Sequence, residues 1–244
     1  MNAEEFFRLI VALGAECVAP VWASRAGGEP PNFVDHNGTI TFVDTGKRLI
    51  GVTARHVLER YRAIAEFPTA ALAINLGRGV TPGFIALDVI DESAEMDIAT
   101  IALPDVREFR GSTKKYFPVS HWPIPKPSRG EPVTIVGFPG VDRKATEERG
   151  TFTLQGIGMT VSNSPGRNVA LVDEQGTLQV TRDGKTRAQG LEPGGLSGAP
   201  GFFFRDGRFH LAGFVYEGTD RILFLAPGAL LQPDGRLRLD TFSG

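Results

Sequence analysis

Cysteine is almost absent from this sequence: Cys17 is the single one among 244 residues. The chain therefore forms no intrachain disulfide, whereas small secreted domains commonly depend on several. Residues 1–5 carry two acids where a secretory signal needs positive charge, and the apolar run 9–13 is too short for a signal or a membrane span. These features predict a cytoplasmic protein with no membrane partner, in which Cys17 is a small buried hydrophobic residue.

An excess of either charge is also missing. Lys and Arg total 26 against 28 Asp and Glu, and the formal net charge is -2. No basic field is present to attract a nucleic acid, so we expect no nucleic-acid partner. The four histidines are widely separated in the sequence and lack the spacing of zinc ligands. We therefore predict no metal site and no cofactor, and we expect structural roles for His36, His121 and His210.

Long helical patterns are scarce. The N-terminal residues alone repeat apolar side chains with helical periodicity, through Phe6, Leu9, Ile10 and Leu13, and Gly14 provides a stop. This pattern predicts a helix over residues 1–15. Elsewhere, short runs rich in β-branched and aromatic residues alternate with turn residues, which is typical of an all-β sandwich or a pair of barrels. The predicted strands are 18–22, 39–43, 49–53, 71–75, 84–89, 98–103, 132–137, 152–160, 169–173, 177–181, 200–204, 210–216 and 222–226.

A proline-rich segment separates the predicted strands into two sets. Five prolines lie within residues 116–132. Because proline fixes φ and has no N–H to donate, this stretch cannot be a central strand, and we predict an extended connector. The predicted organisation is a helix over 1–15, a first β-domain over 16–117, a connector over 118–131 and a second β-domain over 132–244.

Three short strings carry residue types that can act together in nucleophilic catalysis. The string IGVTARHV presents His56 after an apolar strand, EMDIATIAL places Asp97 at the start of another, and EPGGLSGAP holds Ser197 in a glycine-rich loop. A histidine can accept the proton of a serine hydroxyl, and a carboxylate can fix the tautomer of that histidine. Glycines beside the serine let backbone N–H groups, here those of Gly195 and Ser197, point at a developing oxyanion.

In this order the three strings resemble those of the trypsin/chymotrypsin family of serine peptidases. The similarity covers roughly Val18 to Pro227, and the string VTIVGFPG resembles the first strand of that family's second barrel. The resemblance implies an all-β fold of two six-stranded antiparallel β-barrels after the short N-terminal helix. It also implies a serine endopeptidase with Ser197 as nucleophile, His56 as general base and Asp97 orienting the histidine, the first barrel supplying the latter two.

Several positions depart from the family pattern. Val57 replaces the half-cystine that normally follows the histidine, which agrees with a reducing compartment. Leu196 stands where zymogen-activated members have an acid, so activation by a newly cut N-terminus is not expected. Leu191 takes the position at the base of the specificity pocket, where an acid would select Lys or Arg in the substrate. The resemblance places the wall of that pocket at Tyr216, Glu217 and Gly218.

Alternatives exist for the acid and for the function. Asp88 and Asp91 are alternatives for the acid, although neither precedes an Ile-Ala strand. The string GLSGA is close to the nucleophile elbow of α/β-hydrolases, but in that fold the histidine follows the serine, whereas His56 precedes it here. The expected substrate is a protein or peptide. A latent or inactive module that binds a partner, and a peptidase that cuts one specific effector protein, both remain open.

Overall fold

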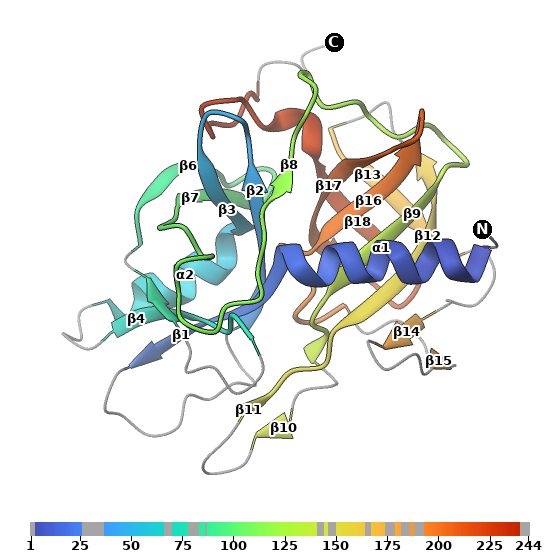
Figure 1. Ribbon diagram of the computed structural model, residues 1–244. Coiled ribbons are helices and arrows are strands. Elements are labelled where there is room, and N and C mark those ends of the chain that lie inside the picture. The colour runs from blue at the N-terminus through green and yellow to red at the C-terminus, as the bar shows by residue number, and fades with distance from the viewer. Residues whose placement is uncertain are drawn as a thin grey trace.

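A computed structural model of the chain contains two large β-sheets that lie side by side, with the N-terminal helix along one side of them (Figure 1). The structure describes residues 3–25, 37–65, 70–77, 83–85, 87–140, 144–145, 150–163, 167–173, 179–181, 186–187 and 193–239.

The first sheet holds the N-terminal half of the strands, which pair antiparallel in the order β5-β4-β1-β2-β3-β7-β6. They are β1 (Val18–Arg25), β2 (Asn37–Asp44), β3 (Leu49–Ala54), β4 (Ala70–Ile74), β5 (Gly83–Ile85), β6 (Val89–Ser93) and β7 (Ile98–Ala102). Because β5 and β6 follow each other along the chain, this one segment pairs with β4 at one end and with β7 at the other. The sheet is therefore barrel-like, with six strand positions around an apolar core.

The second sheet is a closed barrel. Its order is β13-β18-β17-β16-β9-β12, and a further pairing of β12 with β13 closes the ring of six. These strands are β9 (Pro132–Gly137), β12 (Gln155–Asn163), β13 (Val169–Val172), β16 (Pro200–Arg205), β17 (Arg208–Gly218) and β18 (Ile222–Pro227). Four short strands lie outside the ring: β10 (Lys144–Ala145), β11 (Gly150–Thr151), β14 (Gln179–Thr181) and β15 (Thr186–Arg187). The expected pair of six-stranded β-barrels is thus confirmed.

An apolar cluster joins the two barrels. It includes Val52 from β3, Val136 from β9 and Phe214 from β17, all of which are buried. Burial of apolar surface is the main favourable contribution to folding, so this shared core holds the barrels in one fixed relation. Residues supplied by opposite barrels can therefore form one rigid site.

The N-terminal helix α1 (Ala3–Cys17) ends two residues later than predicted. Gly14 does not end it. A Cβ at Gly14 would lie 2.7 Å from Val136 Cβ, and one at Gly156 would lie 2.2 Å from Val11 Cγ2. Gly14 is therefore required by the close approach of the helix to β9, not by a turn. The helix buries Phe7, Ile10 and Val11 in the cluster between the barrels.

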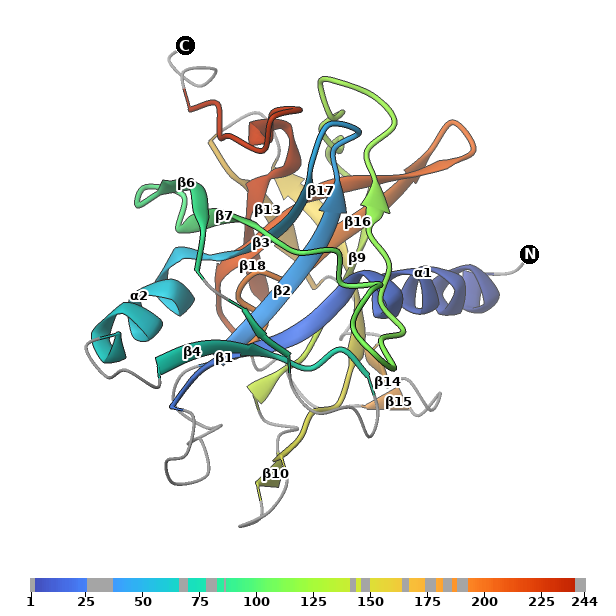
Figure 2. The same ribbon diagram turned by 60° about the vertical axis from the view of Figure 1, so that its left-hand side comes forward.

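A second helix, α2 (Arg55–Ile64), was not among the predicted elements. It begins directly after β3 and lies at the outer side of the first sheet, away from α1 (Figure 2). Val57 and Leu58 are buried, and Tyr61 packs on the same core, so one face of the helix is apolar. Apolar positions at i, i+1 and i+4 were a helical signal in the sequence.

The segment between the barrels begins as a short strand, β8 (Phe117–Pro118), which runs parallel to β2. After it the chain has no regular element until β9 begins at residue 132. The two-residue pairing suits proline, since Pro118 lies at the margin of the sheet.

Most strand boundaries differ from the sequence prediction by one to three residues, and two predicted strands change the most. The strand expected over 84–89 is two strands, β5 and β6, and the second continues to Ser93. The strand expected from Phe152 begins at Gln155. Phe152 instead stacks on Trp22 of β1, with ring centroids 5.3 Å apart. The aromatic contact takes a residue of high β-propensity out of the sheet.

Candidate active site

His56 lies in the first turn of α2, where the chain leaves β3. The first N–H groups of a helix have no partner within the helix. Here Asp97 supplies acceptors for the first two of them: its carbonyl accepts from Arg55 N at 3.0 Å and its Oδ1 from His56 N at 2.9 Å. The residue before the helix, Ala54, makes no side-chain cap. The carboxylate of Asp97 therefore caps α2 from another strand, next to the positive end of the helix dipole.

The second oxygen of the same carboxylate contacts the imidazole. Asp97 Oδ2 lies 2.5 Å from His56 Nδ1. With one oxygen on the backbone N–H and the other on the ring, Asp97 fixes both the position and the plane of the imidazole. A carboxylate can only accept a hydrogen bond, so Nδ1 is the nitrogen that donates. In the neutral ring Nε2 then has the free lone pair and can act as a base. The His56 side chain is 44% exposed, so this base can reach a substrate.

Asp97 has an unusual backbone conformation. Its φ is 46°, in the left-handed region, where aspartate and asparagine are the commonest residues after glycine. Such a conformation costs about 1–3 kcal/mol. The hydrogen bonds to Arg55 and His56 offset that cost, because they form only when the turn after β6 brings the carboxylate under α2. We infer that the strain is part of how the acid reaches the histidine.

Ser197 lies in the loop between residues 193 and 200, where the carbonyl groups of residues 194–197 each accept a hydrogen bond. The carbonyl of Gly194 accepts from Gly140 N at 2.5 Å, that of Leu196 from Ala199 N at 2.7 Å and that of Ser197 from Thr39 N at 2.8 Å. The Gly195 carbonyl accepts from Thr39 Oγ1 at 3.1 Å. Each peptide plane around the serine is therefore fixed.

The fixed planes determine where the neighbouring N–H groups point. In a trans peptide the C=O and the next N–H point in opposite directions. The N–H of Gly195 thus points away from Gly140, and that of Ser197 points away from Ala199. Among the described residues neither N–H donates a hydrogen bond. Gly195 has a φ of 85°, which glycine adopts without strain.

Strand β2 connects the serine loop to the histidine. A Cβ at Gly38 would lie 2.8 Å from the Ser197 carbonyl oxygen and 2.7 Å from Val57 Cγ2, so both residues pack on the side of Gly38 where a side chain would be. Across the described residues no hydrogen bond joins the Ser197 hydroxyl to His56 Nε2. Such a bond is often loose until substrate binds.

The structure describes three of the four residues expected to line a substrate pocket. Leu191 lies outside the described residues. Tyr216 is half-buried on β17, and its hydroxyl accepts from Asn168 Nδ2 at 3.1 Å. Glu217 is exposed. A Cβ at Gly218 would lie 2.4 Å from Leu223 Cδ2 and 3.2 Å from Pro193 Cβ, so this part of the wall faces apolar side chains.

Residues that the sequence analysis did not select also shape the site. Thr39, Thr41 and Thr53 are fully buried and bond to the serine loop or to one another. The alternating pattern T-I-T in a strand that is otherwise apolar was the available signal. Glu95, two residues before Asp97, forms an ion pair with Arg167 of the second barrel. This pair joins the barrels beside the acid.

The alternative residues are engaged elsewhere. Asp91 Oδ1 accepts from Glu92 N, and its Oδ2 accepts from Leu237 N, both at 2.9 Å. Asp88 is exposed, and its backbone carbonyl pairs with Ala102. His121 contacts Ser120 and Arg208, and His210 stacks on Phe203. His36 lies outside the described residues. No set of three metal-ligating side chains gathers within the described part of the chain.

Cys17 is buried, as the sequence predicted. Burial raises the pKa of its thiol to about 12. A thiol with such a pKa is not a nucleophile at neutral pH. None of the helices in the described residues has the length and apolar character that a membrane span needs.

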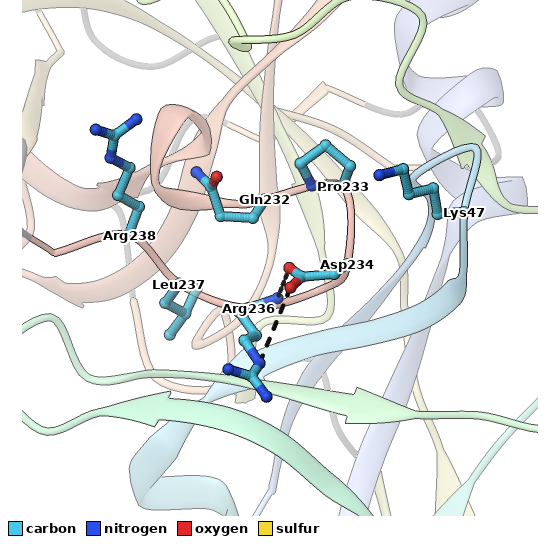
Figure 3. Close-up of a pocket in the computed structure, with 7 residues that line it drawn as sticks. All are labelled: Lys47, Gln232, Pro233, Asp234, Arg236, Leu237 and Arg238. Carbon is cyan, nitrogen blue, oxygen red and sulfur yellow. Dashed lines mark hydrogen bonds and ion pairs between the residues drawn. The ribbon is translucent and has the colours of Figure 1, made fainter.

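A surface pocket of about 380 Å³ lies apart from these residues (Figure 3). Lys47 and the C-terminal segment 232–238 line it, and Asp234 pairs with Arg236. The side chains of Lys47, Arg236 and Arg238 point in different directions and do not converge on one point (Figure 3). The pocket therefore lacks the convergent charges of an anion site.

The arrangement of two barrels is similar to that of solved structures over most of the chain. The crystal structure of Deg5 is similar with a TM-score of 0.51 and 17% identity, covering 93% of this chain and 91% of that one. The MamO protease domain from Magnetospirillum magneticum in its apo form has a TM-score of 0.43 and 13% identity, with 87% and 92% covered. No protein-family model and no curated protein matches the sequence. The chain has the trypsin-like serine protease fold.

In this trypsin-like fold, Leu196 precedes Ser197 and has no exposed surface. It packs among apolar residues of the second barrel, and a Cβ at Gly137 would lie 3.1 Å from its Cδ2. The loop is held by hydrogen bonds of Gly194 and Gly195 to Gly140 and Thr39 instead of by a buried acid. The contacts described for this loop are thus neutral hydrogen bonds and apolar packing.

We expect Leu196→Asp to destabilise the protein by at least about 3 kcal/mol, because it removes a packed side chain and buries an unpaired carboxylate. Burial raises the pKa of such a carboxyl in the folded state above its unfolded value. The variant therefore loses stability as pH rises from about 4 toward 7, by up to about 1.4 kcal/mol per pH unit. Urea denaturation at several pH values measures this. Leu196→Met, at a cost below about 1.5 kcal/mol and without the pH dependence, is the control; equal stability of the aspartate variant at all pH values would contradict the expectation.

Proposed function

We propose that this protein is a serine endopeptidase that hydrolyses peptide bonds through Ser197, His56 and Asp97. The observation that carries the proposal is the double contact of the Asp97 carboxylate with the backbone and the ring of His56. A structural acid needs only one of these contacts. Using both fixes a base whose free nitrogen is Nε2. Val57, the next residue along α2, packs against Gly38 together with the Ser197 carbonyl.

In the proposed reaction the Ser197 hydroxyl attacks the carbonyl carbon of the substrate while His56 Nε2 takes its proton. The N–H groups of Gly195 and Ser197 donate to the oxyanion that forms, and loss of one such donor typically costs about a hundredfold or more in rate. His56 then gives the proton to the leaving amine, which leaves an acyl group on Ser197. Water, deprotonated by His56, releases the acid and restores the serine.

The substrate in this proposal is a protein or peptide that binds along Tyr216, Glu217 and Gly218. The contacts of Gly218 with Leu223 and Pro193 favour an apolar side chain over a basic one at the adjoining subsite. We further propose a cytoplasmic protein with narrow specificity, since the sequence carries one cysteine and lacks the acid used for zymogen activation. A single effector protein is the substrate class that fits this best.

The proposal is tested by reaction with a fluorescent fluorophosphonate, which phosphonylates an activated serine. We expect the purified wild type to be labelled, and Ser197→Ala and His56→Ala to lose labelling. His121→Ala, an exposed histidine elsewhere in the structure, is the matched control and should be labelled as the wild type is. Digestion of a peptide library then reports the cleaved bond. A folded wild type that is never labelled would favour a binding module of the same fold.

A further inference from the structure

Thr39, on β2 of the first barrel, contacts the serine loop of the second barrel through both its backbone and its side chain. Its N–H donates to the Ser197 carbonyl at 2.8 Å, and its hydroxyl donates to the Gly195 carbonyl at 3.1 Å. The same hydroxyl accepts from Phe138 N at 3.2 Å. Thr39 has no exposed surface, so these bonds are formed in the interior, where water cannot replace them.

The hydroxyl of Thr39 completes the fixing of Gly195. The peptide before Gly195 is held by the bond from Gly140 to the Gly194 carbonyl, and the peptide after it is held by Thr39. Between two fixed planes the φ and ψ of Gly195 have one combination available. Glycine otherwise rotates more freely than any other residue. Without the Thr39 bond, the plane after Gly195 would be held mainly by the bond from Leu196 N to Pro193, at 3.0 Å.

Neighbouring glycine and alanine residues make this contact possible. A Cβ at Gly137 would lie 3.2 Å from Thr39 Oγ1 and 2.7 Å from Ala199 Cβ. The absence of a side chain at Gly137 therefore leaves the space in which β9, β2 and the serine loop meet. A single hydroxyl at this junction bonds one group from each of the other two segments.

We propose that Thr39 is a positioning residue for the oxyanion hole: its hydroxyl holds the Gly195–Leu196 peptide, which lies between the two donor N–H groups of Gly195 and Ser197, and so keeps their relative orientation. The inference rests on the proposed peptidase function. Both donor N–H groups belong to the second barrel, and the inference gives a residue of the first barrel a part in positioning them. Thr39 touches neither the substrate nor the reacting atoms and acts through Gly195.

The test compares variants by the maximal rate of inactivation by a fluorophosphonate, kinact, and its apparent binding constant, KI. Thr39→Val keeps the shape and removes the hydroxyl, and we expect kinact to fall about 10- to 100-fold with KI within about twofold. Thr39→Ser restores a hydroxyl and should keep kinact within about threefold of the wild type. Thr45→Val is the matched control: Thr45 is also buried and its hydroxyl also donates to a distant carbonyl, that of Pro233 at 2.6 Å. It should lose stability but keep kinact.

Thr39→Cys, with a weaker donor of similar size, replaces Thr39→Val in the same comparison if the valine variant does not fold. A crystal structure of either variant provides a measurement independent of activity, and the Gly195 carbonyl should be turned away from residue 39. If Thr39→Val reacts as fast as the wild type, or its Gly195 peptide is unmoved, the inference is wrong while the proposed function stands. If the wild type never reacts but the Gly195 peptide turns in the variant, the proposed function fails and the positioning by Thr39 is supported.

Discussion

Replacing Asp97 with asparagine should lower the rate of serine labelling about ten-thousand-fold without unfolding the protein. The backbone N–H of His56 donates to Oδ1 and always needs an acceptor there. An asparagine must therefore turn its oxygen toward this N–H and its NH2 group toward His56 Nδ1. Nδ1 then has to accept, the ring proton moves to Nε2, and Nε2 can no longer take the proton of Ser197.

The same geometry explains why the variant should fold. Asparagine tolerates the left-handed backbone that position 97 requires, and it keeps the acceptor that caps α2. We expect the free energy of unfolding to change by less than about 2 kcal/mol, a loss on the scale of one helix cap. The fluorophosphonate reaction and urea denaturation measure the two quantities on the same sample.

Asp91→Asn is the matched control for this experiment. Asp91 also accepts two backbone N–H groups, from Glu92 and Leu237, but it contacts no histidine. Its variant should be labelled at the wild-type rate within about threefold, whereas any structural effect of the charge change would be similar. A slow Asp91 variant together with a fast Asp97 variant would transfer the role of the acid to Asp91.

The contrast between these two acids shows what the sequence could reveal about the site. Order along the chain and the Ile-Ala strand that follows Asp97 were enough to select His56, Asp97 and Ser197 as candidates. The positive φ of Asp97 and its capping of α2 could not be read in the same way, because both depend on α2 lying over the turn after β6. A contact between residues about forty positions apart leaves no local pattern.

For the fold, too, the sequence predicted the main elements but not which segments meet in space. Period-two runs and the proline-rich break at 116–132 gave two sets of strands, and the structure has two barrels. Gly14 was misread because a glycine at the end of an apolar helix commonly marks a stop, while here it allows close packing on Val136. The role of Thr39 was invisible for the same reason: both depend on which segments meet in space.

Gly198→Ala should destabilise the protein by more than about 3 kcal/mol and abolish labelling of Ser197. Gly198 has a φ of 87°, and an alanine in the left-handed region costs about 1–2 kcal/mol. In addition, its Cβ would lie 2.1 Å from the Thr39 carbonyl oxygen and 2.8 Å from Thr53 Cα, and both of these are backbone atoms. The loop would have to retreat from β2 and β3 to accommodate the methyl group.

Such a retreat would break bonds that hold the serine loop to both barrels. The Gly198 carbonyl accepts from Thr41 Oγ1 at 2.8 Å, and the Gly198 N–H donates to the Val215 carbonyl at 2.7 Å. Both groups lie in the interior, where an unsatisfied polar group costs about 1–3 kcal/mol. Ser197 would move with the loop, so activity should be lost even in molecules that remain folded.

Gly207→Ala is the control that measures the cost of the left-handed backbone conformation without a steric clash. Gly207 lies in the turn between β16 and β17 with a φ of 75°, and a Cβ there would have no atom within 4 Å. Its variant should lose about 1 kcal/mol and keep the wild-type labelling rate, since only the backbone conformation is penalised. Urea denaturation of the two variants side by side gives the difference. Equal losses at Gly198 and Gly207 would mean that the loop yields freely, and that the close contact of Ser197 with the first barrel is not what positions the nucleophile.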